Sequence, residues 1–585
     1  MPGVAHLTTP GTLVKAAGRH QTRGMTEYGP VLTADARPDR SDDPERPWLG
    51  WYAQLQLPDV TIHADLVTMF RRAVATAPDK VAVDYYGWTA TYADLDRLSR
   101  GFAAYLLEQG MERGDRVGIY LQTSPHFMIA ALGVWRAGGV VVTMNPMYRS
   151  TEVGHLLTDS EAVGIVSSQA GYRDVVAAVK PAYTRILVTT SEIDVLTDPD
   201  PRVFGGVVED PVPGTDDVLT VARQFADAPL PEFTPEPDGL AVLCYTSGTT
   251  GPAKGAMLTH RNLAIGIARQ SQWLGTGPHT PIFGAAPLFH AVGLVLGFLH
   301  TLQTVSTICL IYRFVPPVVL DLLLAHRPYF FVGPPTMYTA LMAEPTVSAD
   351  HFASCHRMFA GGAVLPPAVV EEFERRFGRY INNGYGLTET AGACVFAIPN
   401  RPARVDEATQ AMSNGIAHPG TDLRIVGEHG EVLPVGERGE IQIRGDVVTP
   451  GYWRREEETA EAIVDGWFSS GDVGFFDDEH ILYCADRIKD MIIASGFKVW
   501  PGEVEQVLYS QGTVRDAAVV GVPDPYRGET VKAYVTLVPG ATTTPEELTA
   551  WCREHLAAYK APREVEIRQD LPKTISGKIL RRELR

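Results

Sequence analysis

A run of glycines, hydroxyl side chains and one lysine follows an apolar segment near the middle of the chain. The run is Tyr245-Thr246-Ser247-Gly248-Thr249-Thr250-Gly251-Pro252-Ala253-Lys254-Gly255, and the segment before it, Leu240 to Leu243, predicts a buried strand. Glycines let backbone N–H groups point inward, hydroxyls donate hydrogen bonds, and Lys254 adds a mobile positive charge. The glycine spacing is not that of a Walker A loop. A surface turn uses the same residue types, but we interpret the run as a phosphate-binding loop.

A lone histidine and a pair of glycines come later, each beside an apolar segment. His290 ends the string Pro287-Leu288-Phe289-His290, and such a histidine is either a satisfied core residue or part of a site. Gly361-Gly362-Ala363 follows a predicted strand, Met358 to Ala360. Glycines there let a flat ring approach the backbone, although a tight turn would need them equally. Both strings are therefore candidates for a nucleotide or acid site.

The string Asn383-Gly384-Tyr385-Gly386-Leu387-Thr388-Glu389-Thr390 combines an aromatic ring, a hydroxyl and a carboxylate. The two glycines flank the tyrosine, which favours stacking of a planar group on its ring. Thr388 and Glu389 are a hydroxyl and a carboxylate that could hold Mg²⁺ beside a phosphate. We expect this string to contact a nucleotide.

Two charged residues nearer the end each follow a glycine. Asp472 comes after Gly471 in a predicted turn, and one carboxylate can accept both hydroxyls of a ribose. An Asx turn would have the same sequence. Lys578 ends the polar string Pro572-Lys573-Thr574-Ile575-Ser576-Gly577-Lys578. Most lysines are solvated surface residues, but a lysine on a mobile loop of a small domain could act as a swinging catalytic cation.

Composition excludes several classes of protein. The chain has 585 residues and a net charge of −18, which indicates roughly two to four domains and argues against general binding to nucleic acid or anionic membranes. The cysteines have no metal-binding spacing and are expected to be free thiols in a reducing compartment. The first 24 residues lack the apolar core of a signal peptide, and polar residues interrupt the most apolar region, Ala291 to Tyr312. We therefore expect a cytoplasmic protein without a transmembrane segment.

Periodicity predicts an α/β protein. Thr91 to Glu108 is expected to be a helix capped by Thr91 and Asp94. Strand Val117 to Leu121, helix His126 to Ala137 and strand Val140 to Met144 form a βαβ unit, which implies a parallel sheet. Short strands begin at Gly439, and a small α+β domain begins near Arg487. Residues 1–47 are expected to be a flexible leader.

In this order, the strings resemble those of the adenylate-forming (AMP-binding) enzymes, which include acyl-CoA synthetases, firefly-type luciferases and peptide-synthetase adenylation domains. The resemblance extends from about Trp51 to Arg585. It implies a large N-terminal domain, residues 48–486, with parallel sheets, flanking helices and a distorted β-barrel. It also implies a small mobile C-terminal domain, residues 487–585, with a hinge near Lys489. Such enzymes join a carboxylate to ATP, release pyrophosphate, and pass the acyl group to a thiol.

The resemblance implies a role for each string. The β- and γ-phosphates lie on Thr246 to Gly251 with Lys254, and adenine lies on Gly361 to Ala363 and the Gly384-Tyr385-Gly386 string, with Asn383 at its amino edge. Further implied roles are α-phosphate contact for Thr388, Mg²⁺ binding for Glu389, ribose binding for Asp472, adenylate contact for Arg487, and bridging of carboxylate, phosphate and ribose for Lys578. Rotation at Lys489 then brings Ser495-Gly496-Phe497-Lys498 to coenzyme A.

The acid is expected to have an uncharged tail. The segment Gln270 to Tyr312 contains no Asp, Glu, Lys or Arg. It is either a packing helix or one wall of an apolar pocket. In such a pocket His290 would lie in the wall, and Gly293 and Gly297 would leave room for a chain. Asn145 to Arg149 looks similar to the corresponding run of medium- and long-chain fatty acyl-CoA synthetases. Aryl acids remain an alternative, as does transfer to a carrier protein in place of free coenzyme A. A homodimer is compatible with this interpretation.

Overall fold

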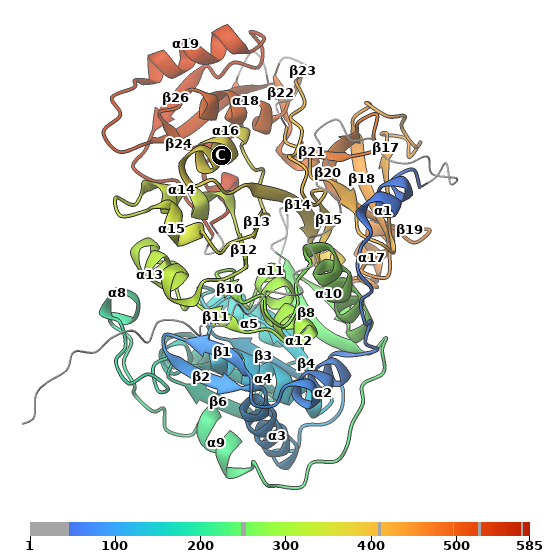
Figure 1. Ribbon diagram of the computed structural model, residues 1–585, viewed down its shortest axis with the longest axis vertical. Helices are drawn as coiled ribbons and strands as arrows, with labels where there is room; N and C mark the ends of the chain where they lie inside the picture. The colour runs from blue at the N-terminus through green and yellow to red at the C-terminus, as the bar shows by residue number, and fades with distance from the viewer. Residues whose placement is uncertain (1–45, 247–252, 408–410, 495–496, 525–527, 575–576) are drawn as a thin grey trace, which may run out of the picture.

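The computed structural model describes residues 46–246, 253–407, 411–494, 497–524, 528–574 and 577–585 (Figure 1). Seven of the predicted site residues lie outside the described residues: Ser247, Gly248, Thr249, Thr250, Gly251, Ser495 and Gly496. The same holds for residues 1–45 of the predicted leader. No helix in the described ranges is long and apolar enough to cross a bilayer.

A seven-stranded sheet in the order β7-β6-β5-β3-β4-β8-β9 forms the lower part of Figure 1. Its pairs are parallel except for β8 and β9, which are antiparallel and enclose the predicted phosphate loop. The predicted βαβ unit is confirmed. The strands are β3 (Arg116–Tyr120), β4 (Val140–Thr143), β5 (Gly164–Ser168), β6 (Ile186–Thr190), β7 (Asp216–Asp217), β8 (Leu240–Thr246) and β9 (Lys254–Thr259).

Helices that precede β3 or lie between the strands of this sheet in sequence pack around it. The first, α3 (Tyr92–Glu108), begins as predicted, because Thr91 accepts from the Asp94 N–H while the Asp94 side chain accepts from Thr91. The others are α4 (Pro125–Arg136), α5 (Ser150–Asp159), α6 (Gln169–Gly171), the π-turn η1 (Tyr172–Val176), α7 (Ala177–Val179), α8 (Pro201–Phe204) and α9 (Val218–Gln224). The helix α4 is buried along its length, which explains its lack of charged residues before Arg136.

A second, nine-stranded sheet has the order β16-β15-β14-β13-β12-β10-β11-β1-β2. It is parallel from β14 to β1, with antiparallel edges at β2 and at β15 and β16. The strands are β1 (Val81–Tyr85), β2 (Trp88–Thr91), β10 (Ile282–Gly284), β11 (Ile308–Leu310), β12 (Phe330–Gly333), β13 (Arg357–Ala360), β14 (Ile381–Leu387), β15 (Gly392–Phe396) and β16 (Ile416–Ala417). Ligands bind beyond the carboxyl ends of such parallel strands, where the predicted nucleotide strings lie.

The helices of this second part include the uncharged segment noted in the sequence. Residues 291–304 form a continuous buried helical stretch, which is followed by β11. The packing helix expected as one alternative for this segment is therefore confirmed. The helices are α2 (Leu66–Thr76), α10 (His260–Leu274), α11 (Ala291–Gly293), the π-turn η2 (Leu294–Leu299), α12 (His300–Thr304), α13 (Pro316–His326), α14 (Pro335–Ala343), α15 (Ala349–Phe352) and α16 (Pro367–Phe377).

An antiparallel five-stranded sheet occupies the region where the resemblance implies a distorted barrel. Helix α1 (Leu49–Leu55) lies against it (Figure 1), where Trp48 stacks on Phe476 and Trp51 donates to the Glu479 carbonyl. The elements are β17 (Thr421–Val426), β18 (Gly439–Gly445), α17 (Glu456–Ala462), β19 (Ile463–Val464), β20 (Trp467–Phe476) and β21 (Leu482–Arg487).

The C-terminal domain has its own sheet and its own apolar core. Its elements are η4 (Ile488–Asp490), β22 (Ile492–Ala494), β23 (Phe497–Val499), α18 (Pro501–Ser510), β24 (Val514–Asp524), β25 (Gly528–Leu537), α19 (Pro545–His555), β26 (Glu564–Ile567) and η5 (Arg581–Glu583). The prediction of a small C-terminal α+β domain is confirmed. Its contacts with the rest of the chain include ion pairs between Arg438 and Glu503 and between Lys498 and Glu428.

Candidate active site

Lys254 lies at the start of β9, directly after the predicted phosphate loop. Its Nζ atom lies 5.4 Å from the centroid of the Tyr452 ring, within the range of a cation–π contact. The neighbouring Ala256 forms a β-bridge with Tyr452, so the backbone of β9 is paired at this point as well. The predicted phosphate-loop cation is therefore held beside an aromatic residue from a segment almost 200 positions later in the chain.

Glu389 lies in a 3₁₀ turn, η3 (Thr388–Thr390), immediately after β14. Its carboxylate is buried and its Oε1 atom accepts a hydrogen bond of 2.9 Å from the Tyr452 hydroxyl. Burial raises the pKa of Glu389, while hydrogen bonds from the backbone and Tyr452, and the Arg487 charge, act in the opposite direction. A contact with Thr388 is among the influences that lower the pKa of the Cys244 thiol, against the larger rise that burial causes.

Asp472 lies inside β20 rather than in the predicted turn, so that prediction is wrong. Gly471 has a φ of +71°, and the pairing of β18 with β20 is irregular here, which indicates a bulge that only glycine readily tolerates. Asp472 Oδ2 accepts from the Tyr385 hydroxyl at 2.9 Å, and Oδ1 lies 3.0 Å from Arg487 Nε. Burial raises the pKa of Asp472, and Arg487 opposes this. The bulge thus aims one carboxylate at two of the predicted site residues.

Lys578 is presented by a tight hairpin. The Thr574 N–H donates to the Lys578 carbonyl at 2.7 Å, and the Lys578 N–H donates to Thr574 Oγ1 at 3.0 Å. The hairpin docks on the larger part of the chain through Gly577, whose carbonyl accepts from Thr336 Oγ1 at 3.0 Å. A Cβ atom on Gly577 would lie 2.4 Å from that Oγ1 and 2.9 Å from Pro334 Cγ. The docking contact therefore requires glycine.

The docked hairpin brings Lys578 into the site. Burial lowers the pKa of Lys578 to about 8, Arg487 adds repulsion and Asp472 opposes the shift. Burial also lowers the pKa of His290 to about 4, with a further contribution from the Lys578 cation. These interactions show that Lys578, Asp472, Arg487 and His290, which are up to 288 positions apart, lie in one electrostatic neighbourhood. His290 is neutral at pH 7.

The predicted adenine wall follows β13. Adding a Cβ atom to Gly361 or Gly362 would meet nothing within 4 Å, and Gly362 has a φ of +79°. Ala363 beside them is exposed. The space in front of this strand end suits a flat ring. By contrast, the Asn383 side chain is buried, with its Nδ2 atom directed at the Met412 and Ser413 carbonyls and its Oδ1 atom accepting from the Gly384 N–H.

Close packing explains why two residues of the predicted site are glycine, whereas a third glycine has only ordinary van der Waals contacts. A Cβ atom on Gly386 would lie 2.2 Å from the Gly392 carbonyl oxygen, so the β14–β15 hairpin requires glycine there. A Cβ atom on Gly293 would lie 2.1 Å from the Pro287 carbonyl oxygen, so the missing side chain serves close packing rather than room for a ligand. Gly297 has only ordinary contacts, with Ile308 at 3.5 Å and Leu288 at 3.8 Å.

The residues of the predicted thiol-binding face are turned to other partners in this arrangement. Phe497 is exposed and stacks on Tyr559, with ring centroids 4.8 Å apart, and Lys498 Nζ lies 2.6 Å from Glu428 Oε1. Lys489 lies in η4, between the antiparallel sheet and the C-terminal domain. These positions belong to an arrangement in which Lys578, and not the 497–498 face, is docked.

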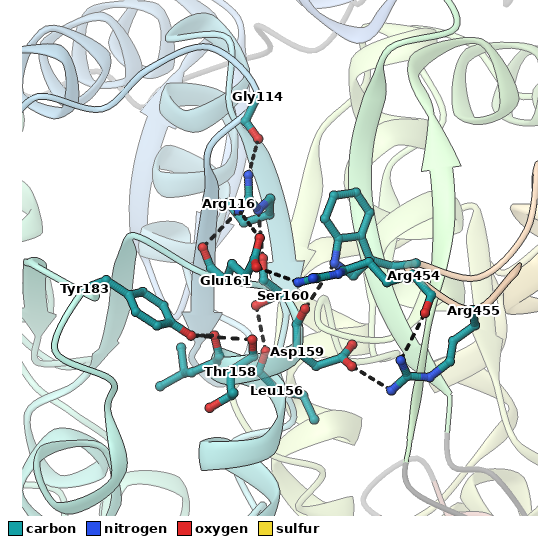
Figure 2. A network of polar contacts seen from close by, with 12 residues as sticks. Gly114, Arg116, Leu156, Thr158, Asp159, Ser160, Glu161, Tyr183, Arg454 and Arg455 are labelled. Carbon is teal, nitrogen blue, oxygen red and sulfur yellow. Dashed lines mark hydrogen bonds and ion pairs between the residues drawn. The ribbon is translucent and has the colours of Figure 1, made fainter.

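Sequence reasoning missed Tyr452, Thr336 and Asp159. Tyr452 contacts both Lys254 and Glu389, and Thr336 anchors the Lys578 hairpin. Asp159 accepts hydrogen bonds from Tyr245, Trp453 and Arg455, as Figure 2 shows in part. The only local signal for Tyr452 was a glycine followed by two aromatic residues, Gly451-Tyr452-Trp453.

The donor set around Glu389 fits magnesium. Mg²⁺ is commonly held by one or two carboxylates together with substrate phosphates and waters. Glu389 offers such a carboxylate, and burial makes its negative charge costly until a cation neutralises it. Within the described residues no cluster of three or more His, Cys, Asp or Glu side chains could hold a metal by itself, so an ion bound here depends on the nucleotide for further ligands.

The sequence matches two family models. Residues 70–453 match "AMP-binding enzyme", and residues 503–578 match "AMP-binding enzyme C-terminal domain". Together with the fold and the docked lysine, these matches define the class: the chain belongs to the AMP-binding enzyme family and is an acid–thiol ligase of the acyl-CoA synthetase type.

Relatives from several organisms span nearly the whole chain. A long-chain-fatty-acid–CoA ligase of Bacillus subtilis (strain 168) is 35% identical over 560 residues, covering 92% of this chain and 98% of the relative. A feruloyl-CoA synthase of Amycolatopsis sp is 36% identical over 516 residues, covering 88% and 97%. The crystal structure of ATP-bound MatB from Rhodopseudomonas palustris superposes with a TM-score of 0.76 at 28% identity, covering 89% and 98%.

Proposed function

We propose that this protein activates a medium- or long-chain fatty acid with Mg²⁺ and ATP and transfers the acyl group to coenzyme A. The observation that carries the proposal is the docking of Lys578 beside Asp472, Arg487 and His290. Two anions, the carboxylate and the α-phosphate, must meet in the first step, and a preorganised cation offsets their repulsion in the transition state. We assign this role to Lys578.

In the first step, a carboxylate oxygen attacks the α-phosphorus of ATP. A bond forms between them, the bond from the α-phosphorus to the bridging oxygen breaks, and pyrophosphate leaves. Lys254 and the 246–251 loop hold the β- and γ-phosphates, and Thr388 contacts the α-phosphate. Glu389 would hold Mg²⁺, which would supply positive charge to offset that of the polyphosphate. Asp472 binds the ribose, with Tyr385 and Arg487 fixing its orientation through the contacts at 2.9 and 3.0 Å.

In the second step, the thiol of coenzyme A attacks the acyl carbon. A carbon–sulfur bond forms, AMP leaves, and the thiol proton is released. The C-terminal domain, residues 487–585, rotates about Lys489 beforehand, which withdraws Lys578 and presents residues 495–498. The separate apolar core of this domain supports movement as a unit, because few apolar contacts have to break.

The proposed acid has an apolar tail. The stretch from His290 to β11 is buried and uncharged, and His290 itself is neutral because burial lowers its pKa to about 4. A buried ammonium or second carboxylate would need an opposite charge, and this wall supplies none among its described residues. The long-chain-fatty-acid–CoA ligase relative from Bacillus subtilis supports the same choice.

An aryl acid is the second candidate. The feruloyl-CoA synthase relative is as similar in sequence as the fatty-acid relative, at 36% against 35% identity. A benzoate or cinnamate would occupy the same apolar wall with its carboxylate toward Lys578. Delivery of the acyl group to a carrier protein is the remaining alternative for the second step.

The test is a pyrophosphate-release screen with purified protein, Mg²⁺ and ATP. The acids are a saturated series from acetate to palmitate, with benzoate and coumarate, each with and without coenzyme A. The proposal predicts the highest kcat/KM for a chain of medium or greater length and faster AMP release when coenzyme A is present. A maximum at coumarate or benzoate selects the aryl alternative. AMP release that coenzyme A does not accelerate points to a carrier-protein acceptor.

A further inference from the structure

Residues 449–455, here called the 449–455 segment, run beside β9, the strand that follows the phosphate loop. The Met257 N–H donates to the Gly451 carbonyl at 3.0 Å, the Trp453 N–H donates to the Gly255 carbonyl at 2.8 Å, and Thr449 Oγ1 donates to the Met257 carbonyl. Since β9 begins at Lys254 and pairs with β8 on its other side, its first residues are bonded on both edges. The 449–455 segment therefore extends the sheet beside the first residues of β9.

Asp159, the last residue of α5, anchors the 449–455 segment. Its carbonyl accepts from Trp453 Nε1 at 3.1 Å, and its Oδ1 atom accepts from Arg455 at 2.7 Å. Its Oδ2 atom accepts from the hydroxyl of Tyr245, on the strand that leads into the phosphate loop, at 2.7 Å. Figure 2 shows Arg455 directed at Asp159 from the facing segment. One aspartate thus ties together the strand before the loop and the segment beside the strand after it.

Tyr452 projects from this anchored segment between the two groups assigned to the polyphosphate. Its hydroxyl donates to Glu389 Oε1 at 2.9 Å, and its ring centroid lies 5.4 Å from Lys254 Nζ. The segment also binds the Glu389 backbone, because the Thr449 N–H donates to the Glu389 carbonyl at 2.7 Å. Glu389 is therefore fixed at its side chain and its main chain by neighbouring residues of the same segment.

We propose that Tyr452 is a positioning residue that holds Lys254 and Glu389 at a set separation for the β- and γ-phosphate end of ATP. This inference rests on the proposed function, because it assigns those two residues to the polyphosphate. A free lysine side chain loses rotamer entropy when it is fixed. The ring restricts Lys254 before ATP arrives, and the hydroxyl orients the carboxylate, so less ordering is left for the binding step.

The proposal separates ligands that have the β- and γ-phosphates from those that lack them. ATP uses both Lys254 and Glu389, because the carboxylate would share Mg²⁺ with the β- and γ-phosphates. AMP and an acyl-adenylate lack those phosphates and so engage neither residue. Loss of the Tyr452 hydroxyl should therefore weaken binding of ATP and leave binding of AMP intact. A residue needed only for folding would affect the two nucleotides alike.

The experiment uses the full-length Tyr452→Phe variant, which keeps the ring and removes the hydroxyl. Binding of a non-hydrolysable ATP analogue with Mg²⁺, and of AMP, is measured by calorimetry. Since a hydrogen bond to a charged group is the interaction removed, we expect about tenfold weaker binding of the analogue. AMP binding and thiolysis of supplied acyl-adenylate should match the parent protein. Tyr452→Leu, which also removes the ring, should weaken binding of the analogue further.

Tyr183→Phe is the matched control. The Tyr183 hydroxyl lies 3.4 Å from the Leu157 and Thr158 carbonyls, near the same helix end, and contacts neither Lys254 nor Glu389 (Figure 2). This variant should bind both nucleotides normally. In a Glu389→Gln background, the hydroxyl no longer orients a charged carboxylate. Tyr452→Phe should therefore weaken binding of the ATP analogue by a smaller factor there than it does in the parent protein.

Two results would overturn the positioning role. One is parent-like binding of the ATP analogue by Tyr452→Phe, and the other is an equal loss for the analogue and AMP. Neither result depends on the acid, so both are distinct from failure of the proposed function. That failure would be seen in the parent protein as the absence of AMP formation with every acid tested.

Discussion

The two lysines of the site, Lys254 and Lys578, are held in contrasting ways. Lys254 begins a strand that is hydrogen bonded on both edges, to β8 and to residues 449–455, and its side chain lies beside Tyr452. Lys578 lies on the returning arm of a hairpin that reaches the larger part of the chain through the bond from Thr336 to Gly577. In the proposed reaction the first cation is needed for as long as polyphosphate is bound. The second must leave before the thiol arrives, so a removable contact suits it.

Removing Lys578 should have the largest effect. We expect Lys578→Ala to slow adenylate formation about 1000-fold, since it removes a charge that acts in the transition state. Thiolysis of supplied acyl-adenylate should continue at the parent rate. The two half-reactions are measured separately, by pyrophosphate release and by thioester formation.

Lys254→Ala is the matched comparison, because it removes the fixed cation instead of the removable one. It should raise the KM for ATP more than it lowers kcat, whereas Lys578→Ala should lower mainly kcat. Equal loss of both half-reactions in Lys578→Ala would contradict its assigned role.

Preventing the hairpin from docking should have the next largest effect. A Cβ atom on Gly577 would lie 2.4 Å from Thr336 Oγ1, so Gly577→Ala should displace a lysine that is still present. A displacement of about 1 Å can cost about 100-fold in rate, and we expect a loss of that order in adenylate formation only. Gly540→Ala is the control, because Gly540 also has a positive φ, +85°, and meets nothing within 4 Å. Similar losses in both variants would show that backbone strain, and not docking, is responsible.

The pH dependence should distinguish the two half-reactions. The pKa of Lys578 is lowered to about 8 by burial, so the lysine is a cation below that pH and loses its charge above it. The kcat/KM for ATP in adenylate formation should therefore fall above pH 8, by about tenfold per pH unit, because it reports the free enzyme. Lys578→Arg should move this limb to higher pH, since arginine stays charged. If thiolysis falls at the same pH, the fall in both reactions comes from the titration of a group other than Lys578.

Breaking an ion pair between the two parts of the chain should have the smallest effect. Arg438 NH1 lies 2.9 Å from Glu503 Oε1, and Glu503 is also paired with Lys560. Glu503 is buried and Arg438 is only partly exposed, but Lys560 still pairs with Glu503 when Arg438 is removed. Arg438→Ala should therefore slow adenylate formation only about two- to fivefold, as for a weak ion pair, leaving thiolysis unchanged or faster. Arg375→Ala, which breaks a pair with Glu372 inside α16, should change neither rate. Loss of both rates in Arg438→Ala would mean that the pair supports the fold rather than the docked state.

Local features of the fold could be predicted from the sequence. The start of α3 was predictable because Thr91 and Asp94 satisfy the free N–H groups of a helix end within three residues. The parallel pairing of β3 with β4 was predictable because a helix of the right length separates two apolar runs. Such signals depend on neighbours in the sequence, and the structure retained them.

Features that depend on distant backbone could not be predicted. Gly386 and Gly293 have the composition of a ligand-binding string, yet each is required by a carbonyl oxygen about 2 Å from where a Cβ atom would lie. Gly471 was predicted to be in a turn and lies at a bulge within β20. Tyr452 is 63 positions from Glu389 and 198 from Lys254, and no periodicity or propensity reports a contact of that range.

Exchange of labelled pyrophosphate into ATP, measured without coenzyme A, tests the central claim most directly. It detects reversible formation of an acyl-adenylate and depends on no later step. With Mg²⁺ and a fatty acid of medium or greater length, the account predicts rapid exchange that stops when the acid is omitted and falls about 1000-fold in Lys578→Ala. Exchange that is independent of acid, or the absence of exchange with any acid of the panel, would contradict it.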